Sequence, residues 1–147
     1  MRILLINGPN LNALAKREPE IYGRDTLDEI LARVQERASQ LGVEVVPFQS
    51  NHEGALIDFI QENQEHAAGM IINPGALGHY SIALRDAISG SELSTLEVHL
   101  SNVFAREPFR HRSVISAVCK GVITGLGWRG YVYALESLVT AQEGVKL

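Results

Sequence analysis

The sequence predicts an α/β protein in which a parallel sheet of five strands lies between two layers of helices. Short apolar runs alternate along the chain with longer segments whose apolar residues recur with helical spacing. Strands that alternate with helices form parallel sheets, because each helix carries the chain back across one face of the sheet. The 147 residues, of which 46% are hydrophobic and 20% charged, suffice for one domain with a sizeable core. We therefore expect a single domain over residues 1–147.

The first elements are a strand and a helix. Residues 3–6 are an unbroken apolar run, as expected for a strand that helices cover on both faces. A helix begins after Thr26, where Glu29 three residues later completes a capping box. Gly42 ends this helix. The apolar residues that recur along its buried face are Leu27, Ile30, Leu31, Val34, Ala38 and Leu41.

The rest of the chain continues the same alternation. The remaining expected elements are a strand at residues 43–48, a helix at 53–65, a strand at 70–72, a helix at about 81–88, strands at 96–100 and 121–124, and a helix at 127–141. No linker, internal repeat or low-complexity segment interrupts them. Five β/α units in this order predict a flavodoxin-like three-layer sandwich with a five-stranded parallel sheet.

The composition disfavours several kinds of partner. Thirteen basic and seventeen acidic residues give a net charge of −4, whereas nucleic acids and anionic membranes attract basic surfaces. Cys119 is the only cysteine, so the chain forms no internal disulfide, and no Cys/His spacing indicates a metal site. The start of the chain is too weakly apolar for a signal peptide, and no apolar run approaches the roughly 18 residues of a membrane span. We expect a cytoplasmic protein that binds no metal.

Polar residues follow four of the predicted strands, at the point where each strand ends. These clusters lie at residues 7–10, 49–53, 73–75 and 99–102. Asn, Gly and Pro are common in turns, so any one cluster can be a simple turn. The carboxyl ends of parallel strands meet at one edge of the sheet, where open α/β sheets bind their ligands. Four clusters together predict the functional site at this edge.

The connection after the first strand, at about residues 8–25, is unusually long. Most βα loops contain roughly two to six residues, and longer ones are often lids over a site. This loop carries Arg17, Tyr22 and Arg24 but no Ser or Thr, and the motifs G-x-G-x-x-G and G-K-[ST] are absent. A phosphate-binding role is therefore disfavoured. We expect a lid.

Six motifs occur in a characteristic order along the chain. They are G-P-N-L-N at residues 8–12, R-E-P-E-I-Y-G at 17–23, Q-S-N-H-E-G at 49–54, N-P-G-A at 73–76, A-L-R-D-A at 83–87 and E-V-H-L-S-N at 97–102. Over nearly its full length the chain closely resembles the type II 3-dehydroquinate dehydratases, lyases of the shikimate pathway, which leads to chorismate and the aromatic amino acids, and of the quinate pathway. The resemblance implies anti-elimination of water from 3-dehydroquinate to give 3-dehydroshikimate through an enolate, without cofactor or Schiff base. It also implies a homo-oligomer, a dodecamer built as a tetramer of trimers.

The resemblance assigns four catalytic residues. Tyr22 matches the family's base, and Arg17 matches the arginine that stabilises its phenolate. His99 matches the acid that expels the hydroxyl as water, and Asn10 matches a residue linked to the enolate. Taken without the resemblance, Tyr22 could be a packing residue, Arg17 an exposed loop arginine, and His99 a buried structural histidine held by Glu97.

Six further residues match substrate-contact positions of the family: Asn73, His79, Asp86, Leu100, Ser101 and Arg110. The backbone N–H groups of Leu100 and Ser101, with the serine hydroxyl, are expected to bind the substrate carboxylate. Asp86 is expected near the site of a neighbouring subunit, although its plainer interpretation is a surface ion pair with Arg85. Arg110 could simply belong to a solvated basic stretch.

Two other functions share parts of this pattern. A flavodoxin-like domain could bind a nucleotide or a flavin, but the long loop lacks a phosphate-binding motif. Ser101 and His99 could suggest a hydrolase, but the sequence has no G-x-S-x-G motif. The chain also departs from common family residues, in ways that concern the lid and inhibitor preference rather than the catalytic positions, at Ala13, Ala15, Leu77, Gly78 and Tyr80.

Overall fold

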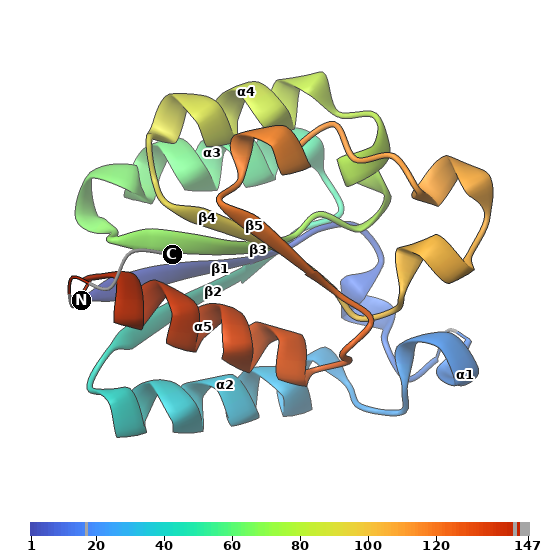
Figure 1. Cartoon of the computed structure of the whole chain (residues 1–147), viewed down its shortest axis with the longest axis horizontal. Coiled ribbons are helices and arrows are strands. Elements are labelled where there is room, and N and C mark those ends of the chain that lie inside the picture. The colour runs from blue at the N-terminus through green and yellow to red at the C-terminus, as the bar shows by residue number, and fades with distance from the viewer. Residues whose placement is uncertain (17, 143, 145–147) are drawn as a thin grey trace.

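The computed structural model describes residues 1–16, 18–142 and 144, and in this part of the chain one sheet of five parallel strands forms the centre. The strands lie in the order β2-β1-β3-β4-β5, with bounds β1 (Arg2–Asn7), β2 (Glu44–Gln49), β3 (Gly69–Asn73), β4 (Thr95–His99) and β5 (Gly121–Thr124). The helices are α1 (Pro19–Tyr22), α2 (Leu27–Leu41), α3 (Glu53–Asn63), α4 (Ile82–Ser91) and α5 (Arg129–Gln142). Figure 1 shows α2 and α5 on one face of the sheet and α3 and α4 on the other. The predicted three-layer, flavodoxin-like sandwich is confirmed.

The central strand β1 explains why the core has two halves. Successive side chains of a strand point to opposite faces. Ile3 and Leu5 therefore pack with residues of α2 and α5, whereas Leu4 and Ile6 pack with residues of α3 and α4. All four side chains are fully buried. The unbroken apolar run in the sequence thus reflects a strand covered on both faces.

The helix ends follow the predicted capping chemistry. The Oγ1 atom of Thr26 accepts a hydrogen bond from the backbone N–H of Glu29 at 3.2 Å, and α2 ends at Gly42 with φ 70°. The hydroxyl of Ser81 likewise accepts from the backbone N–H of Leu84 at 3.0 Å and starts α4. These side chains satisfy N–H groups that have no partner within the helix. No helix among the described residues is long and apolar enough to cross a membrane.

Two connections differ from the expected pattern. The long loop after β1 contains a 3-10 helix at Leu11–Ala13 and the short helix α1, and Leu11 and Leu14 are buried in the core. The connection from β4 to β5 contains three 3-10 helices, at Val103–Ala105, Pro108–Arg110 and Ser116–Val118, and no α-helix. The fourth β/α unit is therefore incomplete, because these residues lack the apolar stripe that would pack an α-helix on the sheet.

Candidate active site

A cavity of about 210 Å³ opens at the carboxyl edge of the sheet, where the sequence placed the functional site. Eight of the ten predicted site residues line it: Asn10, Tyr22, Asn73, His79, His99, Leu100, Ser101 and Arg110. They come from the loops after β1 and β3, from α1, and from the end of β4 and the connection that follows. Segments far apart in the sequence thus converge on one small, partly enclosed space.

Close backbone packing holds the loops after β1 and β3 together. A Cβ atom on Gly8 would lie 2.3 Å from the carbonyl oxygen of Pro74, so only glycine fits there. Gly75 has φ 59°, and a Cβ atom on it would lie 2.9 Å from the carbonyl oxygen of Pro9. Asn10, with φ 71°, donates its backbone N–H to Oδ1 of Asn51 at 2.9 Å. The N-G-P and N-P-G motifs therefore place Asn10 at the cavity wall.

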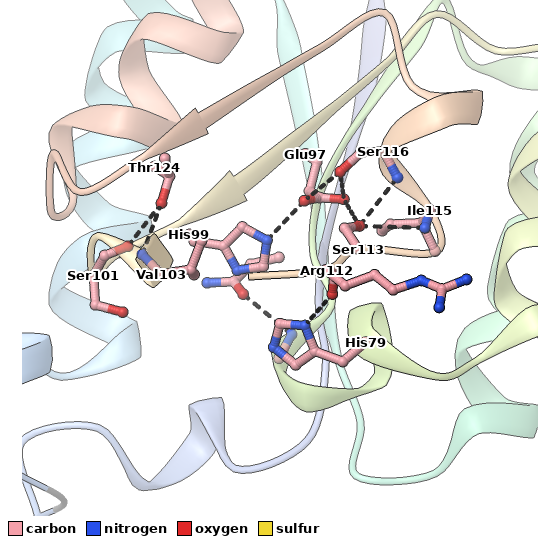
Figure 2. Close-up of polar contacts among 12 residues, drawn as sticks. His79, Glu97, His99, Ser101, Val103, Arg112, Ser113, Ile115, Ser116 and Thr124 are labelled. Carbon is pink, nitrogen blue, oxygen red and sulfur yellow. Dashed lines mark hydrogen bonds and ion pairs between the residues drawn. The ribbon is translucent and has the colours of Figure 1, made fainter. Parts of the chain in front are cut away.

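His99 lies at the end of β4 and pairs with Glu97 on the same strand. Nε2 of His99 lies 2.8 Å from Oε2 of Glu97, and the residues are 8% and 1% exposed (Figure 2). Burial raises the pKa of Glu97, but the hydrogen bond and charge of His99, with the hydroxyls of Ser113 and Ser116, outweigh this and hold that pKa below its ordinary value. Glu97 is therefore a buried carboxylate that fixes one nitrogen of His99.

His79 faces His99 across the cavity. The two rings lie nearly parallel, with centroids 6.4 Å apart. Nδ1 of His79 lies 2.7 Å from the carbonyl oxygen of Arg112 (Figure 2). A carbonyl oxygen only accepts, so Nδ1 carries the proton, and Nε2 of the neutral ring is left as an acceptor.

Asn73, at the end of β3, is fixed by a buried chain of hydrogen bonds. Its Nδ2 atom donates to the hydroxyl of Tyr131 at 2.9 Å, and that hydroxyl donates to Oδ1 of Asn7 at 2.6 Å. Oδ1 of Asn73 accepts from the backbone N–H of Gly75 at 3.2 Å. Tyr131 is fully buried on α5, and burial raises the pKa of its phenol, an effect that the hydrogen bond from Asn73 partly offsets. Tyr131 is therefore a neutral hydroxyl that sets the orientation of the Asn73 amide.

Leu100 and Ser101 begin the connection after β4, and β5 supports them from behind. The hydroxyl of Thr124 donates to the carbonyl oxygen of Ser101 at 2.9 Å and accepts from the backbone N–H of Val103 at 3.3 Å (Figure 2). The backbone N–H of Gly127 donates to the carbonyl oxygen of Leu100 at 3.0 Å. This support fixes the backbone at the cavity wall, as recognition of an anion by backbone N–H groups requires.

Arg106 is a cavity residue that the sequence did not single out. Its Nη1 atom donates to the hydroxyl of Tyr22, and its guanidinium carbon lies 4.9 Å from the centroid of the same ring. The Arg106 side chain is only 11% exposed, and the carboxylates of Glu18 and Glu107 lie 3.7 Å from its nitrogens. A guanidinium held against a phenol oxygen stabilises negative charge there. Arg106 therefore places a positive charge at the Tyr22 hydroxyl, and the role that the resemblance assigned to Arg17 stays a prediction.

Of the two remaining predicted residues, Arg17 lies outside the described residues and Asp86 does not line the cavity. Asp86 is exposed on α4 and lines a separate groove with residues of α3, such as Ile57 and Gln61. Its neighbour Arg85 donates instead to the carbonyl oxygen of Val114 at 2.9 Å. Within one chain, Asp86 therefore faces away from the cavity.

No cluster of three or more His, Cys, Asp or Glu side chains suited to a metal ion occurs in the described part of the chain. The polar groups that the cavity does offer are two imidazoles, a phenol, two guanidinium groups, two amides and a hydroxyl. These groups bind carboxylates and hydroxyls and can add or remove protons. The arrangement suits acid–base chemistry on a small, polar, anionic substrate.

Comparison with known proteins agrees with this chemistry. The profile of the family described as Dehydroquinase class II matches residues 1–139. A 3-dehydroquinate dehydratase from Roseiflexus castenholzii is 61% identical, over 95% of this chain and 88% of that protein. One from Bacillus subtilis is 52% identical, over 96% of this chain and 95% of that protein. The crystal structure of a type II dehydroquinase from Butyrivibrio crossotus has a TM-score of 0.92 at 48% identity, covering 94% of this chain and 97% of that one.

The family match spans nearly the whole sequence, and the relatives are covered over most of their own length. The resemblance that the six motifs indicated is therefore confirmed, and the fold, the polar cavity and the matches agree with one another. This chain belongs to the class II dehydroquinase family.

Proposed function

We propose that this chain dehydrates 3-dehydroquinate through an enolate, with Tyr22 as the base and His99 as the acid. The overall reaction follows from the family: the chain is a type II dehydroquinase, a lyase that forms 3-dehydroshikimate and water. The roles of individual residues are the proposal. The observation that carries it is that Tyr22, with the Arg106 guanidinium at its hydroxyl, and His99, which is paired with Glu97, line the same cavity.

The first step is removal of a proton from the carbon next to the ketone. The Tyr22 phenolate takes this proton, and the electron pair moves onto the ketone oxygen to form the enolate. A phenolate at neutral pH needs a nearby positive charge, which Arg106 supplies at the hydroxyl. We propose that Arg17 helps to stabilise the phenolate in the same step, as the family motifs imply. Asn10 is assigned to bind the enolate oxygen on the same grounds.

The second step is loss of the hydroxyl group. As the enolate collapses, the carbon–oxygen bond breaks, and the leaving oxygen takes a proton from His99 to depart as water. Glu97 holds Nε2 of His99 and stabilises the imidazolium form before transfer. The elimination leaves Tyr22 with one proton more and His99 with one proton fewer. Tyr22 then releases its proton to solvent and His99 takes one up, which restores both residues for the next turnover.

The remaining cavity residues bind the substrate. We assign the carboxylate to the backbone and hydroxyl of Ser101 with the backbone of Leu100, and the ring hydroxyls to Asn73, His79 and Arg110. Asp86 belongs to the site of a neighbouring subunit in a dodecamer, a tetramer of trimers. A cytoplasmic location is part of the same proposal.

The direct test of the reaction follows the absorbance of the enone product. Purified protein is added to 3-dehydroquinate with a strong chelator and without cofactor, and we expect sustained turnover. Treatment with borohydride during turnover should leave the activity unchanged, since the mechanism forms no Schiff base. Loss of activity in chelator that added metal restores, or a substrate-sized adduct on a lysine after borohydride, would contradict the proposal.

A further inference from the structure

A short turn at residues 113–116 forms hydrogen bonds to the carboxylate of Glu97. The turn belongs to the connection between β4 and β5 and contains two half-buried serines. The hydroxyl of Ser113 lies 2.8 Å from Oε1 of Glu97, and that of Ser116 lies 3.0 Å from both carboxylate oxygens (Figure 2). Glu97, Ser113 and Ser116 all line a second pocket that shares His99 with the cavity, and none of the three lines the cavity itself. The hydrogen bonds that connect the serines to the cavity run through Glu97 and His99.

The direction of the Ser113 hydrogen bond is fixed by its other partners. The Oγ atom of Ser113 accepts from the backbone N–H of Ile115 at 3.2 Å and from that of Ser116 at 3.1 Å. A hydroxyl has two lone pairs and one proton, so both lone pairs are engaged and the proton is left for Glu97. A protonated Glu97 would need an acceptor that Ser113 does not offer. Ser113 thus favours an ionised Glu97, and the hydroxyl of Ser116 is free to donate to the same carboxylate.

An ionised Glu97 in turn determines which nitrogen of His99 carries a fixed proton. A carboxylate only accepts, so Nε2 of His99 must donate to it. Nδ1 then points away from Glu97, towards the side of the site where His79 lies (Figure 2). The proton that His99 can give up therefore leaves from Nδ1, on the substrate side.

We propose that Ser113 and Ser116 are positioning residues that keep Glu97 ionised and thereby hold His99 in the orientation and protonation form needed for proton donation. This inference rests on the proposed role of His99 as the acid. A purely structural role for the serines would change the stability of the protein but leave the pH dependence of the reaction where it is.

Other titratable groups lie near Glu97 and His99, and their contributions to the pH profile must be distinguished from that of Glu97. His79 faces His99 from the loop after β3, and Tyr22 faces the cavity from α1. Arg106, Arg110 and His111 approach from the β4–β5 connection. Burial, and to a smaller extent the negative charge of Glu97, raises the pKa of the Cys119 thiol to about 12. Glu97→Gln removes the carboxylate alone and so identifies the part of the pH profile that belongs to it.

The test measures kcat and KM from pH 4 to 9 for Ser113→Ala, Ser116→Ala and the double variant. Loss of donors to the charged form raises the pKa of Glu97, so the acidic limb of the kcat profile should move to higher pH by about one unit in the double variant. We expect kcat at neutral pH to fall about tenfold, the scale of a lost hydrogen bond to a charged group, with little change in KM. Glu97→Gln should lower kcat at every pH, and the profile of its residual activity should lack the limb that shifts in the serine variants.

Three further arms make the outcome decisive. Ser39→Ala, on the exposed surface of α2, should match the parent, and Ser116→Thr, which keeps the hydroxyl, should restore most of kcat. At a pH where the ring is neutral, nitrogen-15 NMR of His99 should show the Nε2-protonated tautomer in the parent and a mixture in the double variant. If the double variant does not fold, the single variants give the same comparison.

Unchanged kcat, pH profile and tautomer in folded serine variants, with a lowered kcat in Glu97→Gln, would overturn the proposal. Full activity in His99→Ala would instead show that the proposed acid is wrong. The two failures are therefore distinguishable.

Discussion

At the residue scale, the proposed role of Tyr22 as the base depends on the positively charged Arg106 side chain at its hydroxyl. Arg106→Ala removes a guanidinium that is nearly buried against the phenol. We expect kcat to fall by about ten- to a hundredfold, since a lost interaction with a charged group costs roughly 1.5–3 kcal/mol.

Steady-state kinetics from pH 6 to 10 check this prediction. Arg129→Ala is the matched control, because Arg129 is exposed on α5 and contacts Trp128 instead of the cavity. An Arg106→Ala enzyme with the parent's kcat and pH profile would assign stabilisation of the phenolate to another group, and Arg17 would be the first to examine.

The buried hydroxyl of Tyr131 gives a prediction about stability. Tyr131→Phe leaves Oδ1 of Asn7 and Nδ2 of Asn73 without their shared partner in the core. The free energy of unfolding should fall by about 1–3 kcal/mol, the cost of leaving buried polar groups unpaired. Urea unfolding measures the change, and Tyr133→Phe on the exposed side of the same helix should be nearly neutral. Equal stability of the two variants would show that the chain of hydrogen bonds contributes nothing.

The sequence predicted most of the cavity residues because short motifs mark them. Arg106 was missed for a physical reason. It lies in a stretch rich in charged residues, which resembles a solvated surface, and the residue that it contacts is 84 positions away. Spacing along the chain cannot reveal such a pair. The hydrogen bonds of Ser113 and Ser116 to Glu97 could not be predicted for the same reason, since these serines follow Glu97 by 16 and 19 residues.

At the element scale, the junction of the loops after β1 and β3 should be sensitive to a single methyl group. Gly75→Ala forces a left-handed backbone on alanine and places its Cβ 2.9 Å from the carbonyl oxygen of Pro9. We expect a loss of more than about 1 kcal/mol in the free energy of unfolding and a higher KM, because the displaced loop carries Asn10.

Thermal or urea unfolding with substrate titration tests the Gly75 prediction. Gly54→Ala is the control, because a Cβ atom there meets nothing within 4 Å and the backbone is helical. A Gly75→Ala protein as stable and as active as Gly54→Ala would show that the loops adjust freely.

The regular elements were predictable because local chemistry decides them. Thr26, Gly42 and Ser81 mark helix ends through hydrogen bonds or a left-handed turn within a few residues. The 3-10 helices of the long connections were not predicted, since their apolar residues pack on distant parts of the fold instead of forming a stripe. Leu11 and Leu14, for example, are buried in the core that α2 and α5 share.

At the scale of the whole molecule, the position of Asp86 distinguishes a site formed by one chain from a site shared between two subunits. It is exposed on α4 and faces away from the cavity of its own chain, so it can act in catalysis only from a neighbouring subunit. We expect Asp86→Ala and Tyr22→Phe each to be nearly inactive alone. Co-expressed, they should form mixed oligomers in which some sites combine an intact Tyr22 with an intact Asp86.

Activity of the co-expressed variants, with the oligomer mass measured by analytical ultracentrifugation, checks this expectation. Recovered activity together with a mass near that of a dodecamer supports the shared site. Full activity of Asp86→Ala alone, or a monomeric active enzyme, would remove Asp86 from the site.

The most direct test of Tyr22 as the base measures hydrogen exchange at the substrate carbon next to the ketone. In deuterated water, proton NMR follows the loss of this signal for the parent, His99→Ala and Tyr22→Phe. Removal of the proton precedes loss of the hydroxyl in an enolate mechanism, so His99→Ala should still catalyse exchange while its dehydration rate falls by ~10²–10⁴-fold. Tyr22→Phe should catalyse neither exchange nor dehydration. Exchange at the parent's rate in Tyr22→Phe would contradict the assignment of Tyr22 as the base.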